Sequence, residues 1–285
     1  MIRQIAVIGT GTMGRGIAYL SALAGYETVI HDIDAGALDA ARASVESTLR
    51  KGVEKGKVAD NLAREAMQRI QLATELEPAV RQADLIIEAV PEDLDLKKNL
   101  FSQADVICGE ETILASNTSS ISISKLAGSV ERRDQFVGMH FFNPPHVMKL
   151  IEIVRGERTS DATVEAVRGV AIKMGKQPIV VRDIPGFATS RLGIAIGLEA
   201  MRMLEDGVAS AEDIDRAMEL GYNHPMGPLR LSDLVGLDVR LGIAEYLTSA
   251  LGSRFEPPEI LRRMVREGKL GRKSGRGFYE WKDEQ

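Results

Sequence analysis

The feature that most constrains the fold of this chain is a glycine-rich turn near its start, Gly9-Thr10-Gly11-Thr12-Met13-Gly14. The turn matches the pattern G-x-G-x-x-G, follows an apolar run of strand length at residues 4–8, and opens an apolar-periodic stretch at residues 15–24. In such a strand–turn–helix unit the first glycine permits the tight turn, the second lets the backbone approach a pyrophosphate, and the third allows close helix–strand packing. The helix N-terminus adds unpaired N–H groups. The pattern therefore predicts a dinucleotide site that includes Gly9, Gly11, Thr12, Met13 and Gly14.

An acidic residue at the end of the second predicted strand indicates which dinucleotide would bind. Asp32 follows an apolar run at residues 27–31 and lies 23 positions after Gly9. A carboxylate there accepts hydrogen bonds from the adenosine ribose hydroxyls and repels a 2′-phosphate. The next residue, Ile33, brings no positive charge to offset that repulsion. NAD is therefore favoured over NADP as the cofactor.

Apolar runs of strand length alternate with amphipathic helical patterns from Met1 to Ile184. Several runs are continuously apolar, as expected for strands that helices cover on both faces. The predicted strands are residues 4–8, 27–31, 70–73, 84–89, 112–115, 136–142, 150–154 and 178–181. Helical patterns lie between them, for example at residues 94–108 and 163–174. The alternation predicts an α/β fold with a mostly parallel, doubly wound sheet of the Rossmann type.

The strand signal ends at the turn-forming sequence Asp183-Ile184-Pro185-Gly186. Long apolar-periodic stretches follow, at residues 187–205, 210–220, 229–251 and 257–267. Ser210 precedes an acidic first turn, which is typical of a helix N-cap. We therefore expect two domains, a dinucleotide-binding domain at residues 1–184 and an all-helical domain at residues 185–285.

Composition narrows the classes of partner and compartment. The chain carries 41 acidic and 36 basic residues, a formal charge of -5, which argues against a dedicated nucleic-acid binder and against a cationic surface for anionic lipid. A single cysteine, Cys108, excludes an internal disulfide and favours a reducing compartment. No signal-peptide pattern and no membrane-spanning apolar run is found, so we expect a cytoplasmic protein. The four histidines show no metal-ligand spacing, so no metal is expected.

A helical insertion separates Asp32 from the third predicted strand. Helical patterns at residues 37–54 and 62–68 fill the gap, and the join between them carries basic residues, namely Arg50, Lys51, Lys55 and Lys57. These side chains could form an ordinary solvated surface, or they could hold the phosphate groups of a second ligand beside the nucleotide site. The residues alone leave both interpretations open.

A histidine and a glutamate on neighbouring predicted strands form a candidate acid–base pair. His140 lies in the strand at residues 136–142, and Glu152 lies in the next one, at residues 150–154. Oxidation of a secondary alcohol by NAD needs a base for the hydroxyl proton, and histidine suits this role because its ordinary pKa is about 6.5. A carboxylate partner would fix the tautomer of the ring. Spacing alone does not separate this role from simple packing of His140 among apolar neighbours.

Several sequence blocks together resemble the signature blocks of the L-3-hydroxyacyl-CoA dehydrogenases, which include the short-chain 3-hydroxybutyryl-CoA enzymes. The resemblance covers essentially the whole chain, with the blocks in the same order. The blocks are the glycine turn, Glu88-Ala89-Val90-Pro91-Glu92, Ser116-Asn117-Thr118-Ser119-Ser120, His140-Phe141-Phe142-Asn143-Pro144, Pro185-Gly186-Phe187, His224-Pro225-Met226-Gly227-Pro228 and Gly271-Arg272-Lys273-Ser274-Gly275-Arg276-Gly277-Phe278-Tyr279.

The resemblance implies a set of residue roles. His140 would be the general base with Glu152 as its orienting partner, and Ser119 would bond the substrate near its 3-oxygen or thioester. The NAD site would be lined by Glu92, Lys97, Ser119, Asn143 and Lys273. Thr48 and Lys55 would contact coenzyme A, which favours the functional interpretation of the insertion. The resemblance also implies a homodimer formed through the helical domain, which would close over an acyl-CoA substrate.

The chain departs from the family pattern at one candidate site residue. The family usually has asparagine in the segment after Pro-Gly-Phe, where this chain has Ser190, so we list Ser190 as a further candidate catalytic residue. Two alternatives to an acyl-CoA dehydrogenase stay open. One is a related NAD-dependent dehydrogenase of a free hydroxy acid or sugar acid, and the other is a non-catalytic nucleotide-binding relative. The basic insertion argues against the first alternative, and the presence of His140, Glu152 and Ser119 argues against the second.

Overall fold

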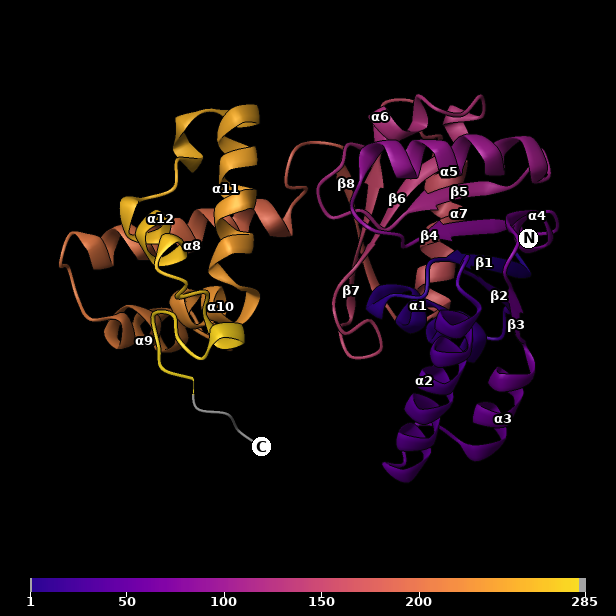
Figure 1. The fold of residues 1–285 in the computed structure, drawn as a ribbon, viewed down its shortest axis with the longest axis horizontal. Helices are drawn as coiled ribbons and strands as arrows, with labels where there is room; N and C mark the ends of the chain where they lie inside the picture. The colour runs from indigo at the N-terminus through magenta and orange to yellow at the C-terminus, as the bar shows by residue number, and fades with distance from the viewer. Residues whose placement is uncertain (1, 282–285) are drawn as a thin grey trace. The chain divides into compact units, whose positions relative to one another are not determined.

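A computed structural model describes residues 2–281 of the chain. The chain divides into two compact units, Met1–Ile184 and Pro185–Gln285 (Figure 1). The first unit is a sheet with helices packed on it, and the second is built from helices.

A single eight-stranded sheet forms the framework of the first unit. The strands are β1 (Gln4–Ile8), β2 (Glu27–His31), β3 (Ile70–Ala73), β4 (Leu85–Glu88), β5 (Ile113–Ser116), β6 (Phe136–Phe141), β7 (Leu150–Arg155) and β8 (Gln177–Arg182). Their order across the sheet is β3-β2-β1-β4-β5-β6-β7-β8. All neighbours run parallel except β6 and β7, which pair antiparallel. The predicted mostly parallel, doubly wound sheet is confirmed.

Helices cover both faces of this sheet. They are α1 (Thr12–Leu23), α2 (Ala35–Glu54), α3 (Asp60–Gln68), α4 (Leu76–Val80), α5 (Leu94–Ile107), α6 (Ile123–Ala127) and α7 (Asp161–Lys173), with a 3-10 turn at Arg133–Gln135. On one face Val7 of β1 shares a buried cluster with Ile17 of α1 and Val167 of α7. On the other face the ring of Phe101 in α5 packs edge-on against that of Phe136 in β6, with centroids 4.7 Å apart. Burial on both faces explains why the strands read as continuous apolar runs.

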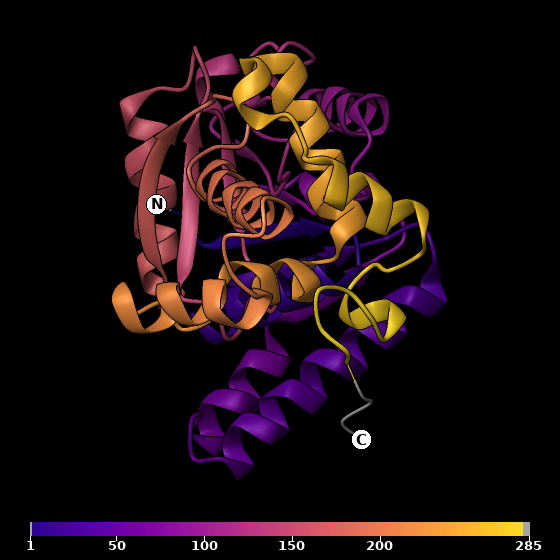
Figure 2. The same cartoon turned by 90° about the vertical axis from the view of Figure 1, so that its left-hand side faces the viewer.

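The predicted insertion is a helical hairpin of α2 and α3 that projects away from the sheet (Figures 1 and 2). Asp34 is the N-cap of α2, because its side chain accepts hydrogen bonds from the N–H groups of Gly36 and Ala37. Both helices begin two residues earlier than the sequence pattern indicated. Val45 and Leu49 on the inner side of α2 belong to the same buried cluster as α1, so the base of the hairpin is part of the core.

The second unit is a bundle of five helices within its described residues. They are α8 (Thr189–Glu205), α9 (Ala211–Gly221), α10 (Pro228–Val235), α11 (Leu237–Leu251) and α12 (Glu259–Arg266), with 3-10 turns at Ser253–Phe255 and Arg272–Ser274. Ser210 caps α9 as predicted, accepting from the N–H of Asp213. The apolar stretch at residues 229–251, in contrast, is two helices rather than one. Gly236 adopts φ 105°, which ends α10, and the periodic burial of leucines continues into α11 and conceals the break.

Among residues 2–281, no helix combines the length and the apolar character needed to cross a bilayer. Within the same residues, no group of three or more His, Cys, Asp or Glu side chains is placed so that it could hold a metal ion.

Candidate active site

The functional segments of the first unit meet at the carboxyl edge of the sheet. Ile8, Glu88 and Ser116 lie side by side at the ends of β1, β4 and β5. Backbone bonds connect the turns beyond them, from the Asn117 N–H to the Glu88 carbonyl and from the Ala89 N–H to the Ile8 carbonyl. Asn117 also reaches the end of β6. The carboxyl edge of a parallel sheet is where ligands bind in folds of this kind.

The glycine turn has the geometry of a phosphate cradle. Gly9 adopts φ 103° and donates its N–H to the carbonyl of His31. A Cβ placed on Gly14 would lie 1.9 Å from the carbonyl oxygen of Gly9, so the first turn of α1 packs directly on the strand. A Cβ on Gly11 would meet no atom within 4 Å, because that position faces open space at the start of the helix. The turn therefore fits a dinucleotide pyrophosphate at the N-terminus of α1.

Asp32 lies beside this turn and is held there by hydrogen bonds. Its Oδ2 accepts from the backbone N–H of Thr10 at 3.1 Å and from the hydroxyl of Thr10 at 2.6 Å. Burial acts to raise the pKa of Asp32, but the bonds from Thr10 and the N–H of Asp34 outweigh it and lower that pKa. The carboxylate is thus ionised at neutral pH, as an acceptor for ribose hydroxyls must be.

Glu92 organises the loop that carries Ser119. Its Oε1 accepts hydrogen bonds from the hydroxyl of Thr118 and from the backbone N–H groups of Ser119 and Ser120. Burial acts to raise the pKa of Glu92, but Lys97 and these hydroxyl contacts outweigh it, so the pKa is lowered. Glu92 and Ser119, predicted to lie in one site, are in contact, with the serine hydroxyl 3.4 Å from Glu92 Oε1.

Lys97 is buried among carboxylates, with 1% of its side chain exposed. Its Nζ lies 2.6 Å from Glu88 Oε1 and 3.1 Å from Glu92 Oε2. Glu88 is fully buried, and burial raises its pKa against the opposing effect of Lys97. Lys97 therefore contacts Glu92, with which it was predicted to lie in one site. Sequence analysis assigned no role to Glu88, since nothing in the sequence marks it as the partner of Lys97.

His140 and Glu152 are a buried cross-strand pair. They stand opposite each other in the antiparallel register of β6 and β7, and Glu152 Oε2 lies 2.8 Å from Nδ1 of His140. Glu152 is fully buried and His140 is 7% exposed. Residues opposite each other on antiparallel strands point to the same face, which explains why two side chains separated along the chain meet here. A carboxylate beside Nδ1 can hold a proton on that atom and so fix the tautomer of the ring.

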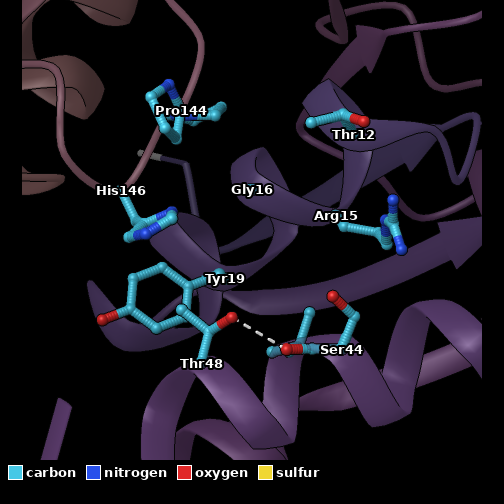
Figure 3. A pocket seen from close by; sticks show the side chains of 10 residues that line it. Thr12, Arg15, Gly16, Tyr19, Ser44, Thr48, Pro144 and His146 are labelled. Atoms are coloured by element: carbon cyan, nitrogen blue, oxygen red, sulfur yellow. Dashed lines mark hydrogen bonds between the residues drawn. The ribbon is translucent and has the colours of Figure 1, made fainter. Parts of the chain in front are cut away.

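Thr48 lines two adjoining pockets beside α1, and Lys55 lines the second of them. The first, which we call the small pocket, has a volume of about 110 Å³ and lies between Thr48 of α2, Arg15 and Tyr19 of α1, and the loop of Pro144 and His146 (Figure 3). The second, the basic pocket, has a volume of about 600 Å³ and shares Tyr19, Thr48 and His146 with the first. Its cationic lining is Lys51, Lys55, Lys57, Lys149 and Lys176.

Arg15, Tyr19, His146 and Lys176 were not recognised from the sequence as pocket residues. Arg15 and Tyr19 are four positions apart on α1 and so share a helix face. This spacing could have been read from the sequence. Asn143, predicted at the NAD site, is exposed and precedes Pro144 in a cis peptide bond at the end of β6.

Two predicted site residues belong to the helical unit. Ser190 lies in the first turn of α8, and Lys273 lies in a 3-10 turn where its Nζ contacts Asp238 Oδ2 at 2.6 Å. The segment around Lys273 is anchored by the buried Asp233, which accepts hydrogen bonds from the N–H groups of Phe278 and Tyr279. The structure gives the local setting of both residues within their own unit.

The fold and the carboxyl-edge residues together define a dinucleotide-binding protein with a histidine–carboxylate pair. Residues 4–184 match the family described as "3-hydroxyacyl-CoA dehydrogenase, NAD binding domain", and residues 186–281 match "3-hydroxyacyl-CoA dehydrogenase, C-terminal domain". The chain belongs to the 3-hydroxyacyl-CoA dehydrogenase family. The resemblance stated from the sequence blocks is confirmed, and the first domain of this family binds NAD.

Named relatives are similar over more than nine-tenths of their length. A probable 3-hydroxybutyryl-CoA dehydrogenase of Bacillus subtilis is 44% identical, covering 99% of this chain and 98% of the relative. The mitochondrial hydroxyacyl-coenzyme A dehydrogenase of Homo sapiens is 39% identical, and the match covers 99% of this chain and 92% of the human protein. The crystal structure of an (S)-3-hydroxybutyryl-CoA dehydrogenase from Ralstonia eutropha superposes with a TM-score of 0.95 at 43% identity, covering 99% of this chain and all of that one.

Proposed function

We propose that this 3-hydroxyacyl-CoA dehydrogenase oxidises the 3-hydroxyl group of short-chain L-3-hydroxyacyl-CoA, such as 3-hydroxybutyryl-CoA, and catalyses the reverse reduction. The observation that carries the proposal is the buried pair of His140 and Glu152 on the same sheet edge as the glycine turn and Asp32. The similarity to 3-hydroxybutyryl-CoA dehydrogenases supports the short acyl chain.

His140 is the proposed general base. Its Nε2 takes the proton of the substrate's 3-hydroxyl, while Glu152 Oε2, 2.8 Å from Nδ1, accepts a hydrogen bond from the Nδ1–H and stabilises the imidazolium that forms. NAD, when bound, supplies the acceptor for the hydride that leaves C3. In the reverse direction His140 returns the proton to the oxygen. The fully buried Glu152 fixes the ring against rotation.

Ser119, Glu92 and Lys97 are the proposed positioning group. The Ser119 hydroxyl is a donor for the substrate near its 3-oxygen or thioester, and the backbone bonds to Glu92 hold its loop in place. Lys97 in turn holds Glu92. In the helical unit Ser190 is the proposed further donor to substrate, and Lys273 is a proposed NAD-binding residue. Asn143 of the first unit is another proposed NAD-binding residue.

The basic pocket is the proposed site of the coenzyme A portion, with Thr48 and Lys55 as contacts. We also propose a homodimer formed through the helical unit, because α9 and its following turn expose Leu220 and Tyr222. The cytoplasm is the proposed compartment, since the only cysteine of the chain, Cys108, is buried and unpaired.

The decisive assay mixes purified protein with acetoacetyl-CoA and NADH and follows the absorbance of NADH. The same assay with free acetoacetate tests the alternative of a free-acid dehydrogenase. Turnover of acetoacetyl-CoA with little turnover of acetoacetate supports the proposal. Equal turnover of the two, or turnover of neither, contradicts it.

Asp32→Ala is expected to erode cofactor selectivity. The parent should prefer NADH over NADPH by at least about tenfold in kcat/KM, because the ionised Asp32 accepts from ribose hydroxyls and repels a 2′-phosphate. The variant loses both effects, so its two kcat/KM values should approach each other. Steady-state kinetics with both cofactors measure this, and equal use of NADH and NADPH by the parent would show that Asp32 does not select the cofactor.

Lys55→Ala is expected to raise KM for acetoacetyl-CoA by about three- to tenfold and to leave KM for NADH largely unchanged. The reason is that Lys55 lines the basic pocket rather than the glycine turn. Arg50→Ala is the matched control, since Arg50 is on the same hairpin but is not among the described residues that line this pocket. If Lys55→Ala leaves KM for acetoacetyl-CoA as unchanged as Arg50→Ala does, the hairpin is an ordinary solvated surface.

A further inference from the structure

The basic pocket concentrates positive charge in a protein whose overall charge is negative. Five lysines line it, and among the described residues of its lining there is no aspartate or glutamate. The chain as a whole carries a formal charge of -5. A local excess of this kind on a net acidic protein is the electrostatic pattern of an anion site.

His146 is carried into this pocket by a loop that is fixed on both sides. The buried Lys176 donates to the carbonyl of Pro145 at 2.5 Å and to that of Met148 at 2.8 Å, immediately before and two residues after His146. The loop also packs on α1 without an intervening side chain, because a Cβ on Gly16 would lie 2.6 Å from Cγ of Pro145. The backbone at His146 is therefore held in one place relative to α1.

The His146 side chain lies in the wall shared by the small and basic pockets. Its ring is edge-on to that of Tyr19, with centroids 6.0 Å apart, and Figure 3 shows the two rings next to each other and near Thr48. Partial burial lowers the pKa of His146, and the charges of Lys176 and Lys57 lower it further. Without a ligand the ring is therefore predominantly uncharged at neutral pH.

We propose that His146 is a phosphate-binding residue of this pocket, which takes up a proton when a phosphate group of coenzyme A binds beside it. The inference rests on the proposed function, in which the pocket holds the coenzyme. The protonated ring donates a charge-assisted hydrogen bond to the phosphate. No catalytic or NAD-binding role is involved.

The charged and titratable groups around His146 explain why uptake accompanies binding. They are Arg15 and Tyr19 on α1, Lys51 on α2, Lys55 and Lys57 after α2, Lys149 before β7 and Lys176 before β8. Burial raises the pKa of Tyr19, so this phenol stays neutral, and every other group in the set is a cation. These cations oppose a charge on His146 until a phosphate neutralises them, and the phosphate itself then favours the imidazolium.

The sign of the pH effect follows from linkage. Binding raises the pKa of His146 above its value in the free protein, so the complex binds more protons than the free protein. The extra affinity is fully present below the pKa of the free protein and is lost as the pH rises through the pKa of the complex. Each unit by which the pKa rises changes the affinity by about tenfold across that range.

The test is isothermal titration of the full-length protein with coenzyme A in two buffers of different ionisation enthalpy. At about pH 7 the parent is expected to take up roughly 0.3 to 1 proton more than His146→Gln. The difference between the two proteins cancels the titration of the coenzyme's own 3′-phosphate, because that group is common to both. Between about pH 6 and about pH 8, Kd should rise about three- to tenfold more in the parent than in His146→Gln. His146→Asn should repeat the result with a shorter amide.

Lys55→Ala separates the two proposals, because it removes a cation and leaves His146 in place. The expected result is that it weakens coenzyme A binding and keeps the proton uptake. If Lys55→Ala weakens binding while His146→Gln matches the parent in proton uptake, the basic pocket binds coenzyme A but the role proposed for His146 is wrong. If neither variant weakens binding, coenzyme A does not use this pocket and both proposals are overturned.

Discussion

His140→Ala is expected to lower kcat by about 10²–10⁴-fold, the usual contribution of a general base. Alanine cannot take the hydroxyl proton, and the fully buried Glu152 would keep its place opposite the shortened side chain. Steady-state oxidation of 3-hydroxybutyryl-CoA measures the loss. Circular dichroism and thermal melting establish whether the fold is retained.

Glu152→Gln distinguishes an acid–base pair from a packing contact. The amide preserves shape and can still bond the ring, but it has no charge to stabilise the imidazolium. We therefore expect a lower kcat together with an altered pH–rate profile, whereas a packing defect would lower activity without changing the profile. Near-normal kcat in His140→Ala would show that the histidine only fills space between β6 and β7.

Lys97→Ala is expected to lower the free energy of unfolding by about 3–5 kcal/mol at neutral pH, the cost of leaving a buried ion-pair partner uncompensated. Lys97 is the cation for two carboxylates, Glu88 at 2.6 Å and Glu92 at 3.1 Å. Without it, burial raises the pKa of Glu88 further above its unfolded value. A carboxyl group whose pKa is raised by folding stabilises the folded state below its unfolded pKa, and this stabilisation is lost as the pH rises. The difference in free energy of unfolding between parent and variant should therefore shrink as the pH falls toward about 4.3.

Lys98→Ala is the matched control for this effect, since Lys98 is the next residue on α5 but is only half-buried. Chemical denaturation of both variants and the parent gives the free energies. Because Glu92 holds the Ser119 loop, Lys97→Ala should also raise KM for acetoacetyl-CoA in the fraction that folds. Equal stability of the Lys97→Ala and Lys98→Ala proteins would show that the buried network tolerates an unpaired carboxylate.

Local patterns were sufficient for most of the sheet. Residues 4–8, 27–31 and 70–73 were predicted with the bounds that β1, β2 and β3 have, because strands covered on both faces are apolar throughout and end where turns begin. The glycine turn was equally predictable from the sequence, because it depends on a few adjacent residues. The turn requires a positive φ at Gly9 and the absence of a Cβ at Gly14.

Periodicity failed where two structures share one pattern. One continuous helix over positions 229–251 and two helices separated by Gly236 bury leucines at the same spacing, and only the φ of 105° at that glycine separates them. Lys97 is a comparable case. Lysines are almost never fully buried without a partner, and a partner contributed by β4 cannot be read from the helix that carries the lysine.

The sequence by itself determined the α/β order of the first unit, the dinucleotide turn with Asp32, and the candidate pair of His140 and Glu152. These depend on residues that are adjacent or that lie on consecutive strands. Only the tertiary structure decided that Lys97 is a buried cation and that His146 shares a pocket with Lys57 and Lys176. The physical reason is that burial and electrostatic fields come from the neighbours that side chains acquire when distant segments pack together, and those neighbours are set by the fold rather than by proximity along the chain.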